Sequence, residues 1–202
     1  MPGAGRQVRR VIRLAQDPEA DAVLTREPFV LLVGMLLDQQ YPMERAFAGA
    51  ARLRQRLGPE HGGLQPAAVS ALPVPVLIEQ CVTPPAVHRY PAAMARRIHA
   101  LAVHICDEYG ADTTAVWRNA RDGAQLRGRL LALPGFGPQK SRIFVALLGK
   151  QLGIQPEGWR EAAGDYGQPG SYRSVADVVD ASSLARVREF KQEQKRQPHV
   201  DS

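Results

Sequence analysis

The sequence predicts an all-α fold, and three features carry that prediction. Apolar residues recur with the 3.6-residue period of a helix along most of the chain, while the strict alternation of a strand is nearly absent. Pro and Gly stand at the starts and ends of the periodic segments, where helices favour them. The clearest case is the amphipathic segment Pro91–Tyr109, which is followed by Gly110, the residue that suits a left-handed C-cap.

The same signals place the elements in order along the chain. The apolar run FVLLVGMLL opens a helical segment, Pro28–Leu57, that stops before Gly58, and the Gly- and Pro-bearing residues 61–71 predict a loop. Further helices are expected at Pro75–Cys81, at Pro91–Tyr109, from a cap at Thr113 or Thr114 through Trp117, at Leu126–Leu133, at Pro138–Leu152 and at Ala181–Arg196. Glycines and prolines interrupt residues 153–172, where the periodicity fades.

Composition excludes several classes of protein. Of the 202 residues, 45% are hydrophobic and 23% are charged, which is typical of one or two small globular domains. No apolar run approaches the ~20 residues of a membrane span. The basic N-terminus has no uninterrupted apolar stretch and no small-residue cleavage site, so no secretion signal is expected. Two cysteines, Cys81 and Cys106, are too few for a disulfide framework and fit a reducing, cytoplasmic location.

The net charge of +6 is concentrated in one part of the sequence. Between Arg118 and Lys150 there are seven basic residues and a single acid, Asp122. Such a local excess favours a polyanionic partner, of which nucleic acid is the common one. A solvated basic face without a partner has the same composition, so charge alone leaves both interpretations open.

The sharpest local pattern is the hairpin Leu133-Pro-Gly-Phe-Gly137 between two apolar helical segments. Glycines at 135 and 137 permit a tight reversal and let another backbone approach closely. Pro138 suits the first turn of the following helix, where a missing N–H costs nothing. The free backbone N–H groups at that helix start would converge on a phosphate oxygen.

With this hairpin, the sequence resembles the helix-hairpin-helix DNA glycosylases, the superfamily that contains endonuclease III and the adenine glycosylases. The family hairpin reads roughly L-P-G-V-G, and this chain has LPGFG at 133–137. The helix that begins YPAAMARRIHALA at Tyr90, and the early stretch LLVGMLLDQQ at 31–40, match two further family segments in the same order.

The resemblance implies two helical lobes with damaged duplex DNA between them. The lobes are a six-helix barrel at residues 27–150, and a second lobe formed by residues 1–26 together with 151–202. The target base is flipped out of the duplex, because a stacked base cannot be reached. The four cysteines of an iron–sulfur cluster are absent, so no such cofactor is expected. The resemblance also implies a monomer, with K⁺ or Na⁺ on the hairpin carbonyls and no metal held by side chains.

The resemblance assigns DNA contacts residue by residue. Gln40 matches the family glutamine that fills the space left by the flipped base, with Gln39 beside it and Tyr41 as a wedge or a core residue. A surface glutamine pair is the alternative for Gln39 and Gln40. The expected contacts of the hairpin and the helix after it are Leu133, Gly135, Phe136, Gly137, Gln139, Lys140 and Arg142.

Two positions depart from the family pattern and bear on the chemistry. Gln139 occupies the slot of the nucleophilic lysine, and Lys140, turned ~100° around the helix, is expected to face phosphate or solvent. The family aspartate falls at Glu157, with Asp165 as a competitor. Its carboxylate would stabilise the positively charged sugar or activate water. Glu157 is equally well explained as an acid at a helix start.

These observations lead to three functional hypotheses. The first is a monofunctional DNA glycosylase that hydrolyses the N-glycosidic bond of a damaged base, with Glu157 as its carboxylate. The second is a DNA-binding protein of the same fold without catalysis. The third is a bifunctional glycosylase and abasic-site lyase that uses Lys140 as its nucleophile.

Overall fold

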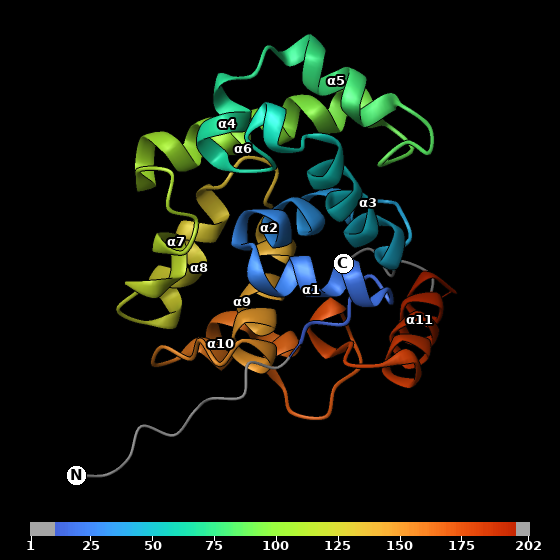
Figure 1. Ribbon diagram of the computed structural model, residues 1–202. Coiled ribbons are helices and arrows are strands. Elements are labelled where there is room, and N and C mark those ends of the chain that lie inside the picture. Colours follow the sequence, from blue (N-terminus) through green and yellow to red (C-terminus); the bar gives the residue numbers. More distant parts are fainter. Residues whose placement is uncertain (1–10, 197–202) are drawn as a thin grey trace, which may run out of the picture.

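The computed structural model describes residues 11–196, and that part of the chain is helical (Figure 1). The all-α prediction is confirmed at this level. Residues 1–10, which include the basic N-terminus and part of the predicted second lobe, lie outside the described residues, as do 197–202. None of the described helices is both long and apolar enough to cross a membrane.

The helices follow one another with short connections. The α-helices are α1 (Pro18–Arg26), α2 (Pro28–Leu37), α3 (Met43–Arg56), α4 (Pro66–Ala71), α5 (Val74–Val82), α6 (Pro91–Tyr109), α7 (Ala115–Arg118), α8 (Gly123–Ala132), α9 (Pro138–Gln151), α10 (Trp159–Ala163) and α11 (Ala181–Arg196). Three short 3-10 helices complete the described chain: η1 (Pro59–His61), η2 (Gly164–Gly167) and η3 (Val175–Asp177).

Several helix boundaries match the sequence-based prediction. The helix at 91–109 ends at Gly110, whose φ of 57° is left-handed as expected. The helices at 138–151 and 181–196 also lie where the periodicity places them.

Other boundaries differ from the prediction for local reasons. The expected helix 28–57 is two helices, α2 and α3. Residues 38–42 between them are not helical, and Pro42 is the N-cap of α3. Part of the loop expected at 61–71 is α4, which has Pro66 in its first turn. Neither threonine side chain caps α7; instead Asp112 accepts hydrogen bonds from the backbone N–H and the hydroxyl of Thr114.

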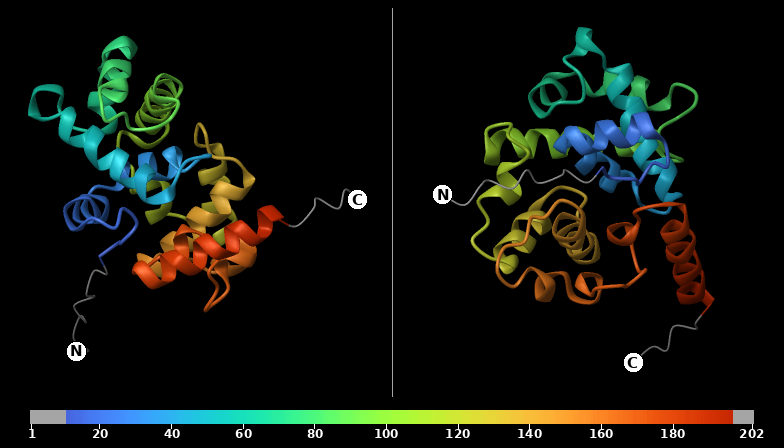
Figure 2. Two further views of the ribbon diagram at one scale, coloured as in Figure 1. Left: turned by 90° about the vertical axis from the view of Figure 1, so that its right-hand side faces the viewer. Right: turned by 60° about the horizontal axis from the view of Figure 1, so that its bottom comes forward.

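α2 lies at the centre of the molecule, and every one of its residues after Pro28 is buried (Figure 1). It packs against α1 and α3 and contacts α6, which lies along α4 and α5. α8, α9 and α10 form a second group of mutually packed helices, with η2 and η3 against α9. Figure 2 shows this second group and α11 on the opposite side of α2 from α4 and α5.

The lobe boundaries expected at residues 27 and 150 do not interrupt this packing. α1 packs on α2 and α3, so Pro18–Arg26 joins the first group of helices. α10 and η3 pack on α9, so these two elements join the hairpin helices. One continuous hydrophobic core includes side chains from all of these parts.

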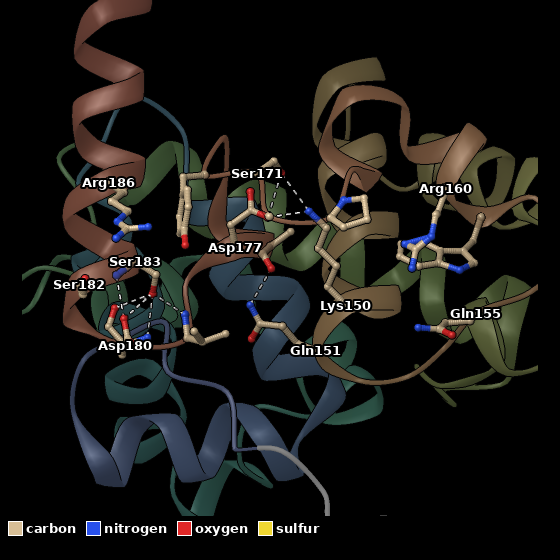
Figure 3. Close-up of a pocket in the computed structure, with 16 residues that line it drawn as sticks. Lys150, Gln151, Gln155, Arg160, Ser171, Asp177, Asp180, Ser182, Ser183 and Arg186 are labelled. Atoms are coloured by element: carbon tan, nitrogen blue, oxygen red, sulfur yellow. Dashed lines mark hydrogen bonds and ion pairs between the residues drawn. The ribbon is translucent and has the colours of Figure 1, made fainter.

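A buried polar network fastens the segment 171–178 to the end of α9. Lys150 and Asp177 form an ion pair of 2.6 Å, with side chains only 16% and 4% exposed, and Ser171 contacts both (Figure 3). The second oxygen of Asp177 accepts backbone N–H groups of Arg173 and Ser174. Both oxygens of the buried Asp177 carboxylate therefore accept hydrogen bonds.

This ion pair generates a stability prediction. We expect Asp177→Ala to lower the free energy of unfolding by about 3–5 kcal/mol, because it leaves the Lys150 ammonium buried without its carboxylate. Urea unfolding followed by circular dichroism measures the change. The matched control is Asp165→Ala, which removes an exposed pair with Arg173 and should cost less than about 1 kcal/mol. Equal losses in the two variants would contradict the prediction.

Candidate DNA-binding hairpin and the polar cluster beside it

The hairpin between α8 and α9 is held by two buried side chains and one tightly packed glycine. Leu133 and Phe136 are buried, and the N–H of Phe136 donates to the Leu133 carbonyl at 3.0 Å. Gly135 has a φ of +83°, and a Cβ there would clash with the Cδ1 atom of Leu36. Gly135 is therefore required by backbone conformation and by the close approach of α2.

Gly137 differs from Gly135 because its surroundings are open. It is the N-cap of α9, with extended backbone at φ −89° and ψ 179°, and a Cβ added there meets no atom within 4 Å. Pro138 follows as the first helical residue, and the first turn of α9 lies at the surface except for Lys140 and Ser141. The unpaired N–H groups of a helix start are thus accessible at this end of α9. Arg142 is exposed on the same helix.

Lys140 points toward the end of α2 and not to solvent, which was one of the two orientations expected from the sequence. Its side chain is half-buried, and Nζ donates to the Leu36 carbonyl at 3.0 Å. Phe144, four residues later on the same face of α9, is buried, and Lys140 Nζ lies 5.8 Å from the centroid of the buried Phe136 ring in the hairpin. Gln139, at the family lysine slot, is exposed and donates to the hydroxyl of Tyr166 at 2.9 Å.

Burial lowers the pKa of Lys140 from 10.5 to about 8. The nearby positive charge of Arg97 lowers this pKa further, whereas the carboxylate of Asp38 opposes the shift. A lysine with this pKa carries an appreciable fraction of free amine near neutral pH, whereas an exposed lysine carries almost none.

Residues 39–40 after α2, here called the glutamine loop, lie beside Lys140. Three side chains hydrogen-bond to this loop. Arg97 donates to the Gln39 side-chain oxygen at 2.6 Å, and His88 bonds the Gln39 carbonyl at 3.1 Å. Arg89 reaches the Gln40 carbonyl at 3.4 Å. Gln40 is exposed, and its φ of +52° is unusual for a residue other than glycine. The bracing keeps Gln40 in this strained conformation.

His88 supports this loop as a neutral imidazole. Its Nδ1 accepts the backbone N–H of Tyr90 at 3.0 Å, so Nε2 carries the proton and donates to Gln39. Burial lowers the pKa of His88, and the positive charges of Arg89, Lys140 and Arg97 act in the same direction. Tyr41 packs on the His88 ring at a centroid distance of 4.6 Å, which places Tyr41 in the support of the loop.

Asp38 is a member of this cluster that sequence reasoning missed. It follows the last residue of α2, its backbone N–H bonds the Gly34 carbonyl, and its side chain is half-buried. Burial raises the pKa of its carboxyl group, Lys191 and Lys140 oppose the shift, and Glu44 adds to it. Its position in the sequence could have indicated a site residue, because it is an acid that directly follows an apolar helix and precedes the glutamine pair.

Glu157 lies away from this cluster, at the opposite end of α8 from the hairpin. The N–H of Gly123, the first residue of α8, donates to the Glu157 carbonyl at 2.7 Å. The hairpin starts after the last residue of α8, about 15 Å away at 1.5 Å per residue. Glu157 is exposed, and so is Asp165, which pairs with Arg173 at 3.3 Å. Tyr166, the next residue after Asp165, accepts a hydrogen bond from Gln139 in the first turn of α9.

Two cavities lie outside the hairpin and its polar cluster. One, of about 450 Å³, is bordered by Lys150, Asp177 and Arg186 (Figure 3). The other, of about 480 Å³, runs along α8 and includes Arg127 and Glu157. No residue of the hairpin 133–137 lines either one.

Within residues 11–196, no three His, Cys, Asp or Glu side chains gather in a way that could hold a metal ion. In comparisons with known proteins, no family model matches the chain and no curated protein matches it.

Proposed function

We propose that this chain is a DNA repair protein that binds damaged duplex DNA and cleaves the N-glycosidic bond of a flipped base. The observation that carries the proposal is the hairpin, in which Gly135 lies against Leu36 of α2 while Gly137 leaves the start of α9 open. An open helix start with accessible N–H groups suits a DNA phosphate. The sequence of the hairpin also resembles that of the helix-hairpin-helix glycosylases.

The position of the glutamine loop supports the same function. The bond from Lys140 to the Leu36 carbonyl holds the start of α9 against the end of α2, and the glutamine loop begins two residues after Leu37. A duplex gripped at the hairpin would therefore pass close to Gln39 and Gln40. The amide of Gln40 can donate and accept hydrogen bonds, which suits contact with an unpaired base.

A monovalent cation remains part of the proposal. The Leu133 and Gly137 carbonyls each accept one backbone hydrogen bond, from Phe136 and Ser141. Because a carbonyl oxygen has two lone pairs, each could still coordinate K⁺ or Na⁺. Such an ion would add positive charge where the phosphate is expected.

We expect Gly137→Val to weaken duplex DNA binding by about 10- to 100-fold, because the side chain blocks contacts between backbone N–H groups and a phosphate. Fluorescence anisotropy with a labelled duplex measures the affinity, at several salt concentrations because phosphate contacts are salt-sensitive. Gly128→Val is the matched control, since a Cβ at Gly128 on α8 also meets no atom within 4 Å. Unchanged affinity in a folded Gly137→Val protein would remove the hairpin from the interface.

Base release distinguishes a glycosylase from a DNA-binding protein without catalysis. A panel of duplexes, each with one modified or mismatched base, tests for the freed base. Release from at least one duplex supports the glycosylase. Tight binding with no release from any duplex favours the non-catalytic protein.

Lys140 favours a second candidate function, a glycosylase that is also an abasic-site lyase. A nucleophilic lysine needs a lowered pKa, and the half-buried Lys140 has one of about 8. Its Nζ lies at the end of α2, beside the glutamine loop that would contact the DNA. The same lysine in an exposed position would remain charged and serve only as a phosphate contact.

We expect sodium borohydride to trap a covalent complex between the protein and duplex DNA with an abasic site. The trapping rate should rise as pH increases through about 8, because the free amine of Lys140 is the reacting form. Gel electrophoresis of the reduced complex measures the rate. Lys140→Arg should abolish trapping, whereas Lys191→Arg, which changes another lysine close to Asp38, should leave it intact. Trapping that persists without Lys140 would exclude this candidate.

A further inference from the structure

We propose that Asp38 is the acid–base partner of Lys140, exchanging a proton with its amine while the amine reacts at the sugar. This inference rests on the lyase form of the proposed function. It assigns the carboxylate role to the end of α2, and not to Glu157 or Asp165 in the C-terminal part of the chain.

The backbone places the two groups together. Lys140 Nζ is bonded to the carbonyl of Leu36, and Asp38 lies two residues further along the same chain turn. Both residues are half-buried. Although each influences the pKa of the other, no ion pair joins these two described residues. The carboxylate and the amine are therefore close but not in direct contact, and a proton exchanged between them passes through one bridging water molecule.

The surrounding charges come from four further elements. Lys191 of α11 and Glu44 of α3 act on Asp38, and Glu44 itself pairs with Arg188 of α11. Arg97 of α6 acts on Lys140, while its guanidinium binds the Gln39 side chain. His88, in the segment before α6, is held neutral by its two hydrogen bonds. Asp38 is thus the one acid among the groups that act on Lys140.

Burial brings the proton affinities of the two groups closer together. It raises the pKa of Asp38 and lowers the pKa of Lys140. A proton passes between two groups most readily when their pKa values are similar. Glu157 and Asp165 are exposed and show neither this burial nor a place beside Lys140. The same environment that frees the amine therefore prepares Asp38 as its partner.

The Lys140 amine adds to the C1′ aldehyde of an abasic sugar, forming the N–C1′ bond while the C=O electron pair moves to oxygen. Asp38 takes a proton from the nitrogen, which becomes a neutral carbinolamine once the oxygen is also protonated from water. The protonated Asp38 then gives its proton to the departing hydroxyl, water leaves, and the nitrogen lone pair forms the iminium ion. Asp38 returns to its ionised form, and borohydride reduces the iminium carbon by hydride transfer.

The test compares Asp38→Asn with the wild-type protein in borohydride trapping across pH 6 to 10. We expect the variant to trap about 100-fold more slowly, the usual scale for losing an acid–base group. The pH midpoint should also move to lower pH, because the Asp38 charge that raises the pKa of Lys140 is gone. Asp38→Glu, which restores a carboxylate, should recover part of the rate and the midpoint.

Three controls separate this inference from the proposed function. Asp107→Asn removes the same charge from an exposed position near the end of α6 and should trap like the wild type. Circular dichroism verifies the fold, and anisotropy with a duplex containing a tetrahydrofuran abasic analogue verifies binding. A carboxylate that acted on Lys140 through its charge alone would shift the midpoint but leave the trapping rate unchanged at high pH, where the amine is free in both proteins.

Several results would overturn the inference. Wild-type rate and midpoint in Asp38→Asn would exclude Asp38 while the lyase function stands. A loss of rate with an unchanged midpoint would make Asp38 structural. Loss of trapping in Glu157→Gln, with Asp38→Asn still active, would return the carboxylate role to Glu157. Absence of trapping by the wild-type protein would refute the lyase function, and the role of Asp38 with it.

Discussion

The hydrogen bond from Lys140 to the Leu36 carbonyl joins the first turn of α9 to the last turn of α2. The last carbonyls of any helix lack partners within the helix, and the lysine supplies one for α2. The negative end of the α2 dipole favours a cation at this position, while burial disfavours it. Because burial has the larger effect, the pKa of Lys140 falls to about 8. The position of the hairpin and the chemistry of its lysine thus depend on the same contact.

The loop after α2 shows how a buried helix can present a polar end. α2 is apolar along its whole length, so it anchors the residues that follow it with little freedom to move. His88 and Arg97 then bind the two acceptors of Gln39, its backbone carbonyl and its side-chain oxygen. This arrangement leaves Gln40 exposed with its backbone already ordered. A contact made by an ordered side chain loses less conformational entropy on binding.

Much of the fold could be predicted from the sequence, because helices of 14 residues or more leave a clear period in their apolar residues. The break between α2 and α3 and the short α4 were missed, since they depend on one or two turns next to proline. The hairpin was visible because glycine and proline act locally. Its surroundings were not, because the burial of Lys140 depends on α2, about a hundred residues earlier in the chain.

In the candidate site, too, some residues could be identified from the sequence, whereas others depend on contacts with distant parts of the chain. Gly137 and Gln40 are exposed; Gly137 was identified from the local hairpin pattern and Gln40 from the family resemblance. Asp38 was not identified as a site residue, since its role comes from groups on other helices. Glu157 was selected by counting residues along the chain. The loop after α9 instead carries it to the start of α8, where its backbone pairs with Gly123.

The buried polar network at the end of α9 also affects the local unfolding of the protein. The Gln151 amide donates to three carbonyls, those of Val175, Ala176 and Val178, and Lys150 adds its bond to Asp177. If this segment detached, α9 would be left with buried donors that nothing satisfies. The segment and α9 therefore form a single cooperative unit for hydrogen exchange, in which the amides of both are protected or released together. A chain shortened before residue 171 would lose order in α9, and with it the support of a hairpin more than thirty residues away.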